Sequence, residues 1–577
     1  MSAIEMQDPI EDVASTIAGL WVSLNNQRQG WLQRVSEVRD YVTSPTTAFT
    51  EVGSTLPWKN KTTIPILTQI ADNLQSYYMA ALMPSDDWFR WEGRDVESQA
   101  KANLIEEYMR TKVNMSGFRA ELEQLTRDWI IYGNCFAGIS YVTEKTKSAV
   151  NGEEIVNYQG PRLQRISPLD CVIDQNATTF DSSPLIIRKL VPIVDILSHN
   201  EQNSSPPYNN EALEKIKHLR GNRNDKDFVK QYKDRGLKID GFVTFEEYLD
   251  SQYIEIMEMW GDVYDTSSGE VLKNRVITIA DRCVVLRNDE NPAWDGKKPF
   301  VHVGWRVLPD NLYGQGPLDH LVGMQYRIDH LENLKADAFD QIIHPMMKIT
   351  GDTVEDFEFG PGQKIYCGSE GNVEFLRPDT SVLMANNEIA IYRQYMELGA
   401  GSPRESAGFR SPGEKTAFEV STLQQGADRM FMDKLNHFEE QGIQKILSLF
   451  FELMMRNFDI KDVARTFNDD TGALEIATFT KEDVVADGVF HPMGAKYFAA
   501  RNKRIQELQN LLMIVQNPQI APHVSGLNAG KMLEEELGFE KWNIIEENAA
   551  VKEQIMTQVY GQQMQQAVGG GGQPPVE

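Results

Sequence analysis

The stretch NLYGQGP, Asn311 to Pro317, runs directly into LDHLVGMQYRIDHLENLKADAFDQIIHP, and this succession decides the fold. Pro317 fixes φ near the helical value at a first helical position, where its missing N–H costs nothing. Gly314 and Gly316 permit backbone angles closed to other residues, and Gly316 caps the helix. Asp319 falls in the first turn, where the positive end of the helix dipole stabilises a carboxylate. The pattern predicts a long helix with a pinned start at Pro317.

This helix is expected to bury one stripe and to end at His344, before Pro345. Its apolar positions recur at spacings of three and four: Leu318, Leu321, Met324, Ile328, Leu331, Leu334, Ala338 and Ile342. Asp329, Glu332 and Asp340 lie close to one face away from that stripe. They form either an ordinary solvated surface or an acidic face that lines something.

The composition is that of a multidomain globular protein of 577 residues, with 41% hydrophobic and 24% charged residues. The formal net charge of -27 repels phosphate and argues against tight nucleic-acid binding. Four widely spaced cysteines predict neither a disulfide framework nor a zinc site and favour a reducing compartment. The acidic N-terminus is not a signal peptide, and no segment is apolar enough to span a membrane.

The rest of the chain predicts an α+β, mainly α, protein. Helical periodicity marks the segments around 17–41, 64–83, 100–114, 118–132 and 386–398 and the forty residues 417–457. Short β-type runs dominate 138–305, and Arg275–Ala280 with Cys283–Arg287 predicts a hairpin. Residues 346–380 are expected to form small strands and turns, and a polar insert at 200–236 one short helix, Glu211 to Leu219.

No constellation predicts catalysis, a cofactor or a metal site. GFRSPGEKT, Gly408 to Thr416, resembles a phosphate-binding P-loop, but Glu414 stands between Gly413 and Lys415 and places a carboxylate against the phosphates. We therefore interpret 399–416 as a basic loop that carries Arg404, Arg410 and Lys415. No histidine pair has the spacing of a zinc site, and we expect no enzymatic activity.

Three blocks together resemble the portal protein, or head-to-tail connector, of tailed double-stranded-DNA bacteriophages, especially the short-tailed, podovirus-like type. The first is PWKNKTTIPILTQIADNLQSYYMAALMPSDDWF at 57–89. The second is DWIIYGNCFAGISYV followed by ISPLDCVIDQNATTFDSS, within 128–183. The third is PFVHVGWRVLPDNLYGQGP with the long helix that follows.

The resemblance implies a portal fold with wing, stem, clip and crown. It divides the chain into an N-terminal helical wing (1–145), a β-rich wing subdomain (146–312), a stem helix (313–345), a clip (346–383), a second stem helix (384–398), a tunnel loop (399–416), a long wing and crown helix (417–480), a helical crown (481–567) and a disordered tail (568–577). Tyr313, Gly314, Gly316 and Pro317 would then form the structural motif that holds the stem at a fixed tilt.

The resemblance also implies a homododecameric ring at one vertex of the virion capsid, assembled in the host bacterial cytoplasm. The terminase large subunit would drive DNA through it during packaging, and DNA would leave through it at ejection. The implied partners are the major capsid protein and scaffold, the tail adaptor and non-specifically passing double-stranded DNA. An acidic wall at Asp329, Glu332 and Asp340 would repel the duplex, and Arg404, Arg410 and Lys415 would contact it weakly and reversibly.

Two other functions are open. A tail-tube or adaptor ring component would lack long central helices and a wing-sized N-terminal region. An enzyme, such as a nucleotidyl-processing protein, would show metal-dependent turnover, which no motif predicts.

Overall fold

The computed structural model describes residues 12–43, 60, 62–84, 88–147, 154–202, 207–221, 252–265, 269–293, 296–343, 346–351, 370–376, 384–401, 431–457, 462–467, 474–480, 482, 485–494 and 530–531. The chain forms two compact units, and each combines distant segments: Met1–Met79 with Ser116–Phe450, and Ala80–Met115 with Phe451–Glu577. This division differs from the contiguous wing and crown segments predicted from the sequence, because the second unit takes one strand and two helices from the N-terminal quarter. Helices and strands are mixed, as expected for an α+β protein.

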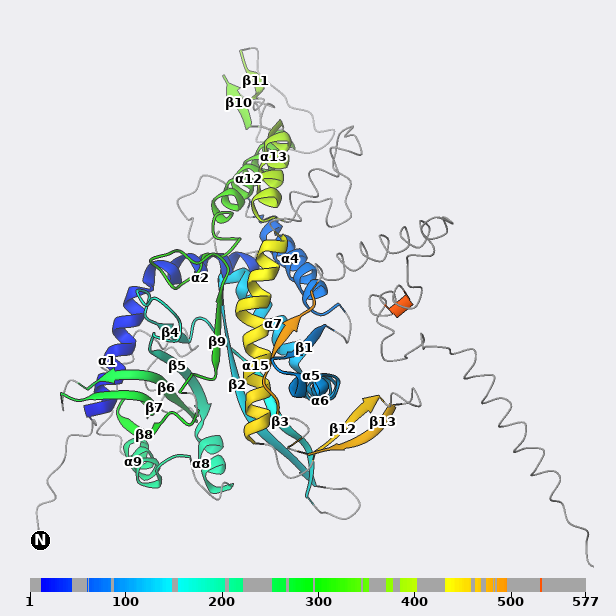
Figure 1. The fold of residues 1–577 in the computed structure, drawn as a ribbon. Coiled ribbons are helices and arrows are strands. Elements are labelled where there is room, and N and C mark those ends of the chain that lie inside the picture. Colours follow the sequence, from blue (N-terminus) through cyan, green and yellow to red (C-terminus); the bar gives the residue numbers. More distant parts are fainter. Residues whose placement is uncertain are drawn as a thin grey trace, which may run out of the picture. The chain divides into compact units, whose positions relative to one another are not determined.

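The first unit contains a five-stranded antiparallel sheet between two helical layers (Figure 1). Its strands follow chain order: β4 (Cys171–Ile173), β5 (Leu185–Pro192), β6 (Tyr253–Tyr264), β7 (Val271–Ala280) and β8 (Val284–Glu290). Helix α1 (Asp12–Gln27) buries Ile17, Trp21 and Leu24 against one face. Helices α8 (Ile193–Gln202) and α9 (Asn210–Gly221) bury Ile196 and Leu213 against the opposite region of the sheet. A sheet covered on both sides explains its nearly continuous apolar strands.

The predicted hairpin is confirmed as β7 paired with β8. Asp281 and Arg282 form its turn with φ of 45° and 62°. Two successive left-handed residues match the right-handed twist of the flanking strands, as in a type I′ turn. Arg282 is an unusual residue at such a position, and its side chain is held by a buried ion pair with Glu255.

A second sheet, in the order β3-β2-β9, carries the aromatic core of this unit. Its strands are β2 (Asn134–Lys147), β3 (Glu154–Ile166) and β9 (Phe300–Gly304). Helix α7 (Phe118–Ile131) packs on β2 and β3. The ring of Trp129 lies 4.2 Å from that of Trp305 and 4.7 Å from that of Phe438, and Tyr78 lies 4.6 Å from Phe431. Tyr78 belongs to α4 (Ile66–Leu82), so this cluster joins four distant segments of the chain.

Two adjacent helices, α12 (Val322–Ile343) and α13 (Ala385–Gly399), with the hairpin of β10 (Met346–Thr350) and β11 (Asn372–Leu376) between them in the chain, form what we call the stem pair (Figure 1). The predicted second helix and small strands are confirmed. The predicted start of the first helix at Pro317 is wrong, because residues 317–321 form turns before α12. Asp319 accepts a hydrogen bond from the N–H of Gly316 and closes such a turn.

The second unit is built around β1 (Phe89–Gly93), which pairs antiparallel with β14 (Gly488–Pro492). Helices α5 (Val96–Ala100) and α6 (Ala102–Met115) pack on β1. Phe89 and Phe451 both lie against Phe490, at 5.8 and 5.5 Å. A further hairpin joins β12 (Asp462–Phe467) and β13 (Leu474–Phe479).

The long helix predicted over 417–480 is corrected at its C-terminal end. Residues 431–438 are helical, η3 (Glu439–Ile443) is one π-helical turn around Gly442, and α15 (Gln444–Arg456) completes the helix. Strands β12 and β13 follow it, and β14 lies within the segment predicted as a helical crown. Residues 417–430 and most of 495–577 lie outside the described residues.

Candidate functional site: the stem junction

The chain reaches the stem pair through a set of contacts that we call the stem junction: Gly133, Asn134, Gly304, Tyr313, Gly314 and Gly316. Asn134, at the start of β2, is fully buried at 0% exposure. Its Nδ2 donates hydrogen bonds to the carbonyl oxygens of Gly314 (3.0 Å) and Tyr132 (3.2 Å). Its Oδ1 accepts from the N–H of Gly314 (2.8 Å) and from Nε2 of His302 (3.0 Å). One amide thus satisfies both backbone groups of Gly314.

The glycines of the junction are required by close backbone contact. A Cβ on Gly133 would lie 2.4 Å from the nitrogen of Gly316, and a Cβ on Gly314 would lie 2.6 Å from the oxygen of Gly133. Neither Gly314 nor Gly316 has a positive φ. The predicted reason for these two glycines is corrected: they make room for the neighbouring chain and do not supply unusual backbone angles.

Tyr313 connects the junction to the N-terminal helices and to the five-stranded sheet. Its side chain is buried, its hydroxyl oxygen accepts a hydrogen bond from the N–H of Ile173 (3.1 Å), and its ring lies 5.0 Å from that of Trp31. Burial raises the pKa of Tyr313 to about 12, while the neighbouring charge of Arg28 opposes the rise. The phenol is therefore neutral and acts as a packing and hydrogen-bonding group.

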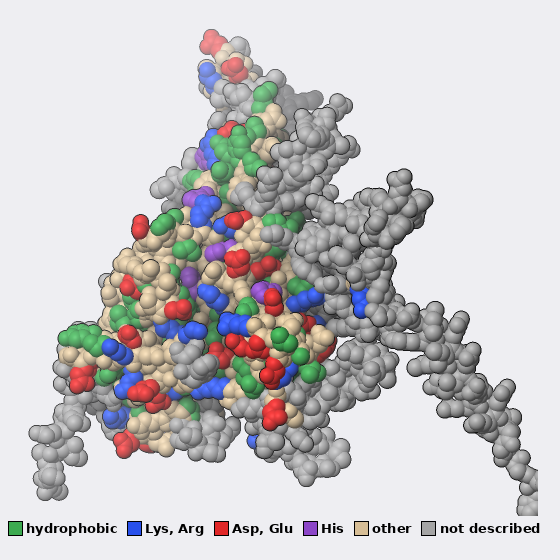
Figure 2. Space-filling view, in the orientation of Figure 1, with side chains coloured by type: hydrophobic (Ala, Val, Ile, Leu, Met, Phe, Trp, Pro, Cys, Tyr) green, Lys and Arg blue, Asp and Glu red, His purple; other side chains and the backbone are tan. Residues whose placement is uncertain are grey.

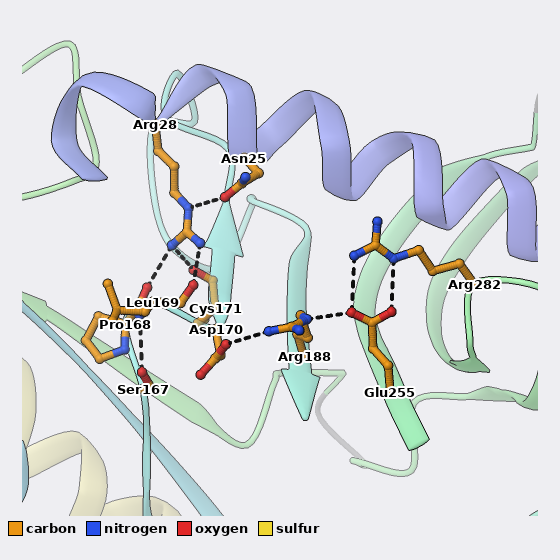
Figure 3. Close-up of polar contacts among 10 residues, drawn as sticks. All are labelled: Asn25, Arg28, Ser167, Pro168, Leu169, Asp170, Cys171, Arg188, Glu255 and Arg282. Atoms are coloured by element: carbon orange, nitrogen blue, oxygen red, sulfur yellow. Dashed lines mark hydrogen bonds and ion pairs between the residues drawn. The ribbon is translucent and has the colours of Figure 1, made fainter. Parts of the chain in front are cut away.

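Arg28 anchors the N-terminal helices to the segment around β4 (Figure 3). It lies between α1 and α2 (Gln29–Thr43), with 1% of its surface exposed. The guanidinium donates to the carbonyl oxygens of Pro168 and Cys171, each at 2.7 Å, and of Leu169 at 2.5 Å. Its Nε donates to Oδ1 of Asn25 (3.0 Å). The rigid fork of donors thus fixes the chain before β4 to the break between two helices.

A second buried network in Figure 3 holds the five-stranded sheet in register. Glu255 on β6 is fully buried and accepts from Nε of Arg188 on β5 (2.5 Å) and from Nε of Arg282 in the β7–β8 turn (3.0 Å). Arg188 also pairs with Asp170 (3.2 Å). A buried carboxylate is tolerated here because two cations and their hydrogen bonds compensate its lost hydration.

The helical segment from 431 also contacts the junction. Lys434 donates from Nζ to the carbonyl oxygen of Trp305 (3.0 Å), and Nε2 of His437 lies 3.1 Å from the carbonyl oxygen of Gly304.

Burial lowers the pKa of His302 to about 3. This ring is neutral, and its Nε2–H donates to Asn134 because an amide oxygen only accepts. A cavity of about 240 Å³ lies beside the junction, lined by Tyr78, Trp305, Pro317, Leu321, Phe431 and Lys434 among others.

The structure brings together Tyr313, Gly314, Gly316 and Pro317, as the sequence predicts for a structural motif. The three predicted acidic residues are placed differently from one another. Asp329 is corrected: only 8% exposed, it accepts from the N–H of Ile64, so its carboxylate points at its own chain and not at an open face. Glu332 pairs with Lys335, and Asp340 is exposed. Arg404, Arg410 and Lys415 lie outside the described residues.

No role was predicted from the sequence for Asn134, which organises the junction, or for Arg28, which anchors the helices beside it. The only signal was the Gly133-Asn134 pair in the YGN motif after a predicted helix. Within the described ranges, no three His, Cys, Asp or Glu side chains could hold a metal ion, and no helix is long and apolar enough to cross a membrane. The contacts of the stem junction are those of a structural attachment that holds the segment before α12 in place.

Comparison with known proteins gives the class. Residues 14–156 match the family model described as bacteriophage head to tail connecting protein. The matched segment contains Arg28, Trp31 and Asn134, which supply the N-terminal side of the junction. No curated protein matches the chain. The match supports a head-to-tail connector, a component of a bacteriophage virion.

Proposed function

We propose that this chain is the portal subunit of a tailed phage, and that twelve copies form a ring through which DNA is packaged and ejected. The observation that carries the proposal is an apolar seam along α13. Met384, Ile391, Tyr395 and Leu398 are 76, 50, 55 and 63% exposed. Their spacings of seven, four and three place them on one face of the helix. Figure 2 shows hydrophobic side chains gathered over the stem pair.

Other positions of α13 are already used within the chain. Away from the seam, Met396 is fully buried and Asn386 accepts a hydrogen bond from Lys335 of α12 (3.0 Å), and Glu388, beside the seam, pairs with Arg327 of α12 (3.3 Å). A seam of large apolar side chains with this exposure is typical of protein interfaces. Phe339, Ile342 and Ile343 at the far end of α12 are also exposed. We infer that each copy offers the α13 seam to α12 of the next, because contacts between different faces generate rings when the rotation closes.

The charge of the chain fits a conduit that does not bind its cargo tightly. A net charge of -27 disfavours stable phosphate contacts. We propose Glu332 and Asp340 as wall residues and Arg404, Arg410 and Lys415 as weak duplex contacts, with no catalytic activity in the ring itself. Replacing the three cations with Gln in assembled particles is expected to reduce DNA retention after packaging. Unchanged packaging and retention would count against these contacts.

The decisive experiment is end-on electron microscopy of the purified protein, with native mass spectrometry. We expect twelvefold particles with a central channel, and we expect the Tyr395→Glu, Leu398→Glu double variant to remain monomeric but folded. Val194→Glu is the matched control, because Val194 is a 60% exposed apolar residue on α8, outside the stem pair. Rings that persist in the double variant would contradict the assigned interface. A wild-type chain that stays monomeric with scaffold and capsid protein would contradict the portal function.

The same particles test the partners. We propose that the major capsid protein and scaffold, the terminase large subunit and the tail adaptor bind the assembled ring and not the monomer. Co-sedimentation of each purified partner with wild-type protein and with the double variant measures this dependence. Equal binding to both would show that these contacts do not require the ring.

A further inference from the structure

Asn60 and residues 62–64 lie along α12 and are bonded to it by side chains of the helix. We call these residues the strap. The N–H of Asn60 donates to Asp337 Oδ1 (3.0 Å), the N–H of Thr62 to Asn333 Oδ1 (2.7 Å) and the N–H of Ile64 to Asp329 Oδ1 (3.1 Å). In return Asn333 Nδ2 donates to the carbonyl oxygen of Thr62 (3.1 Å), and Gln325 Nε2 to that of Ile64 (2.6 Å). Alternate strap residues therefore meet every fourth residue of the helix.

This pairing works because the two repeats nearly coincide. Two residues of extended chain advance about 6.6 Å, and four residues of helix advance about 6 Å. Over a few residues, a column of side chains on α12 can therefore supply the hydrogen-bonding groups that a neighbouring β-strand would offer to the strap backbone. Gln325 and Asn333 are each 1% exposed, so water does not compete for these strap bonds.

Asp329 is the ionisable member of the buried part of this column. It lies four residues from Gln325 and four from Asn333, and both hydrogen bonds to its Oδ1 come from neutral groups, the Ile64 N–H and Gln325 Nε2 (2.9 Å). The described strap residues carry no charge, and the ionisable group that interacts with Asp329 from α2 is Tyr41. Burial raises the pKa of Asp329 to about 6, and its two hydrogen bonds oppose the rise. Burial and the Asp329 charge raise the pKa of Tyr41, so this phenol is neutral.

We propose that the strap is a proton-sensitive attachment between the N-terminal part of the chain and α12, tightened when Asp329 is protonated and loosened when it ionises. Lifting the strap would expose Asp329 to water, where its pKa returns to about 4. Protons therefore favour the attached strap. As pH rises through about 6, the attached state loses this advantage. The proposal concerns a single chain and does not depend on the ring.

The expected size follows from the two pKa values. A difference of about two units shifts the ratio of attached to lifted strap by about 100-fold in total. The ratio of attached to lifted strap changes about tenfold between pH 8 and pH 5. The remaining change appears only near pH 4, where the Asp329 carboxyl of the lifted state also takes up its proton.

Hydrogen exchange of the full-length protein tests the proposal. After correction for intrinsic exchange rates, protection of peptides spanning 62–66 is expected to rise about tenfold from pH 8 to pH 5 in the wild type. It is expected to be independent of pH in Asp329→Asn, which keeps the acceptor and removes the charge. Asp337→Asn is the matched control, because it changes a half-buried carboxyl of the same column and should keep the wild-type pH dependence.

Either of two results overturns the proposal: a wild-type profile without pH dependence, or the same dependence in Asp329→Asn. If Asp329→Asn does not fold, the wild-type profile decides alone. Protection that begins to rise as pH falls below about 6 supports the strap, and a flat profile refutes it.

Discussion

Replacing Asn134 with Ala tests whether one buried amide holds the stem junction. The change removes the Asn134 partner of three polar groups: the N–H and carbonyl of Gly314 and Nε2–H of His302. The carbonyl of Tyr132 also loses Asn134 but still accepts from Nε1 of Trp31 (3.3 Å). A buried polar group without a partner costs about 1 to 3 kcal/mol. At the lower value for each of the three groups, the variant is expected to lose about 3 kcal/mol in free energy of unfolding.

Urea unfolding at pH 7, followed by tryptophan fluorescence, measures this loss because Trp129 and Trp305 lie in the adjoining aromatic core. Protein concentration and oligomeric state must match, since association alone changes apparent stability. Asn157→Ala is the matched control: Asn157 is an exposed asparagine on β3 whose amide bonds only to Thr146, and we expect a loss below about 0.5 kcal/mol. A loss under about 1 kcal/mol for Asn134→Ala would refute the role assigned to this residue.

Two further substitutions test the packing and the charge of the same region. Gly314→Ala places a methyl 2.6 Å from the oxygen of Gly133 and is expected to cost more than about 2 kcal/mol in thermal or urea unfolding. Gly323→Ala, on α12 with nothing within 4 Å, should instead stabilise by up to about 1 kcal/mol, and equal effects of the two would contradict the close-contact argument. Asp329→Asn is expected to raise stability by up to about 3 kcal/mol at pH 7.5 and by about half as much at pH 5, because the raised pKa of Asp329 makes the wild type more stable as pH falls through about 6. An unchanged or lower urea midpoint at pH 7.5 would contradict the burial of a charged carboxylate.

The helices and the apolar strands could be predicted because their patterns are local. The segments predicted around 100–114, 118–132 and 386–398 correspond to α6, α7 and α13, and α6 and α7 each bury apolar side chains. The β7–β8 hairpin was evident from two β-type runs separated by two residues. Such features need only side-chain periodicity and turn chemistry, which the sequence displays directly.

Strand β3 was missed because Gly160 and Pro161 interrupt its pattern. The sheet order makes β3 an edge strand, where a missing donor is tolerated. The N–H of Arg165 points away from β2 and donates to Glu121 (2.8 Å), so the nitrogen of Pro161, four residues earlier, faces the same open side. Pro161 therefore removes no hydrogen bond between β3 and β2. Strands β12 and β13 were also missed, because they lie within 417–480, the segment assigned to the long wing and crown helix.

The organising residues of the junction could not be predicted from local pattern, because their partners are distant in sequence. Asn134 bonds to a residue 180 positions away, and Arg28 bonds to carbonyl groups about 140 positions away. An asparagine after a glycine and an arginine between two helices are ordinary surface residues by composition. Only the fold reveals that each is buried and makes four hydrogen bonds to the groups around it.

The two attachments of the stem pair differ in the chemistry that holds them, and this difference bears on how the pair could move. At the junction, Asn134, Tyr313 and neutral His302 have no charge to gain or lose near neutral pH, so the hydrogen bonds of these three side chains do not depend on their protonation there. Farther along α12, the attachment of the strap depends on Asp329, whose pKa is raised by burial to about 6. A helix held firmly at its base and adjustably along its length can change its contacts with the strap while its starting point stays fixed. The junction therefore acts as the fixed point, and adjustment is confined to the strap.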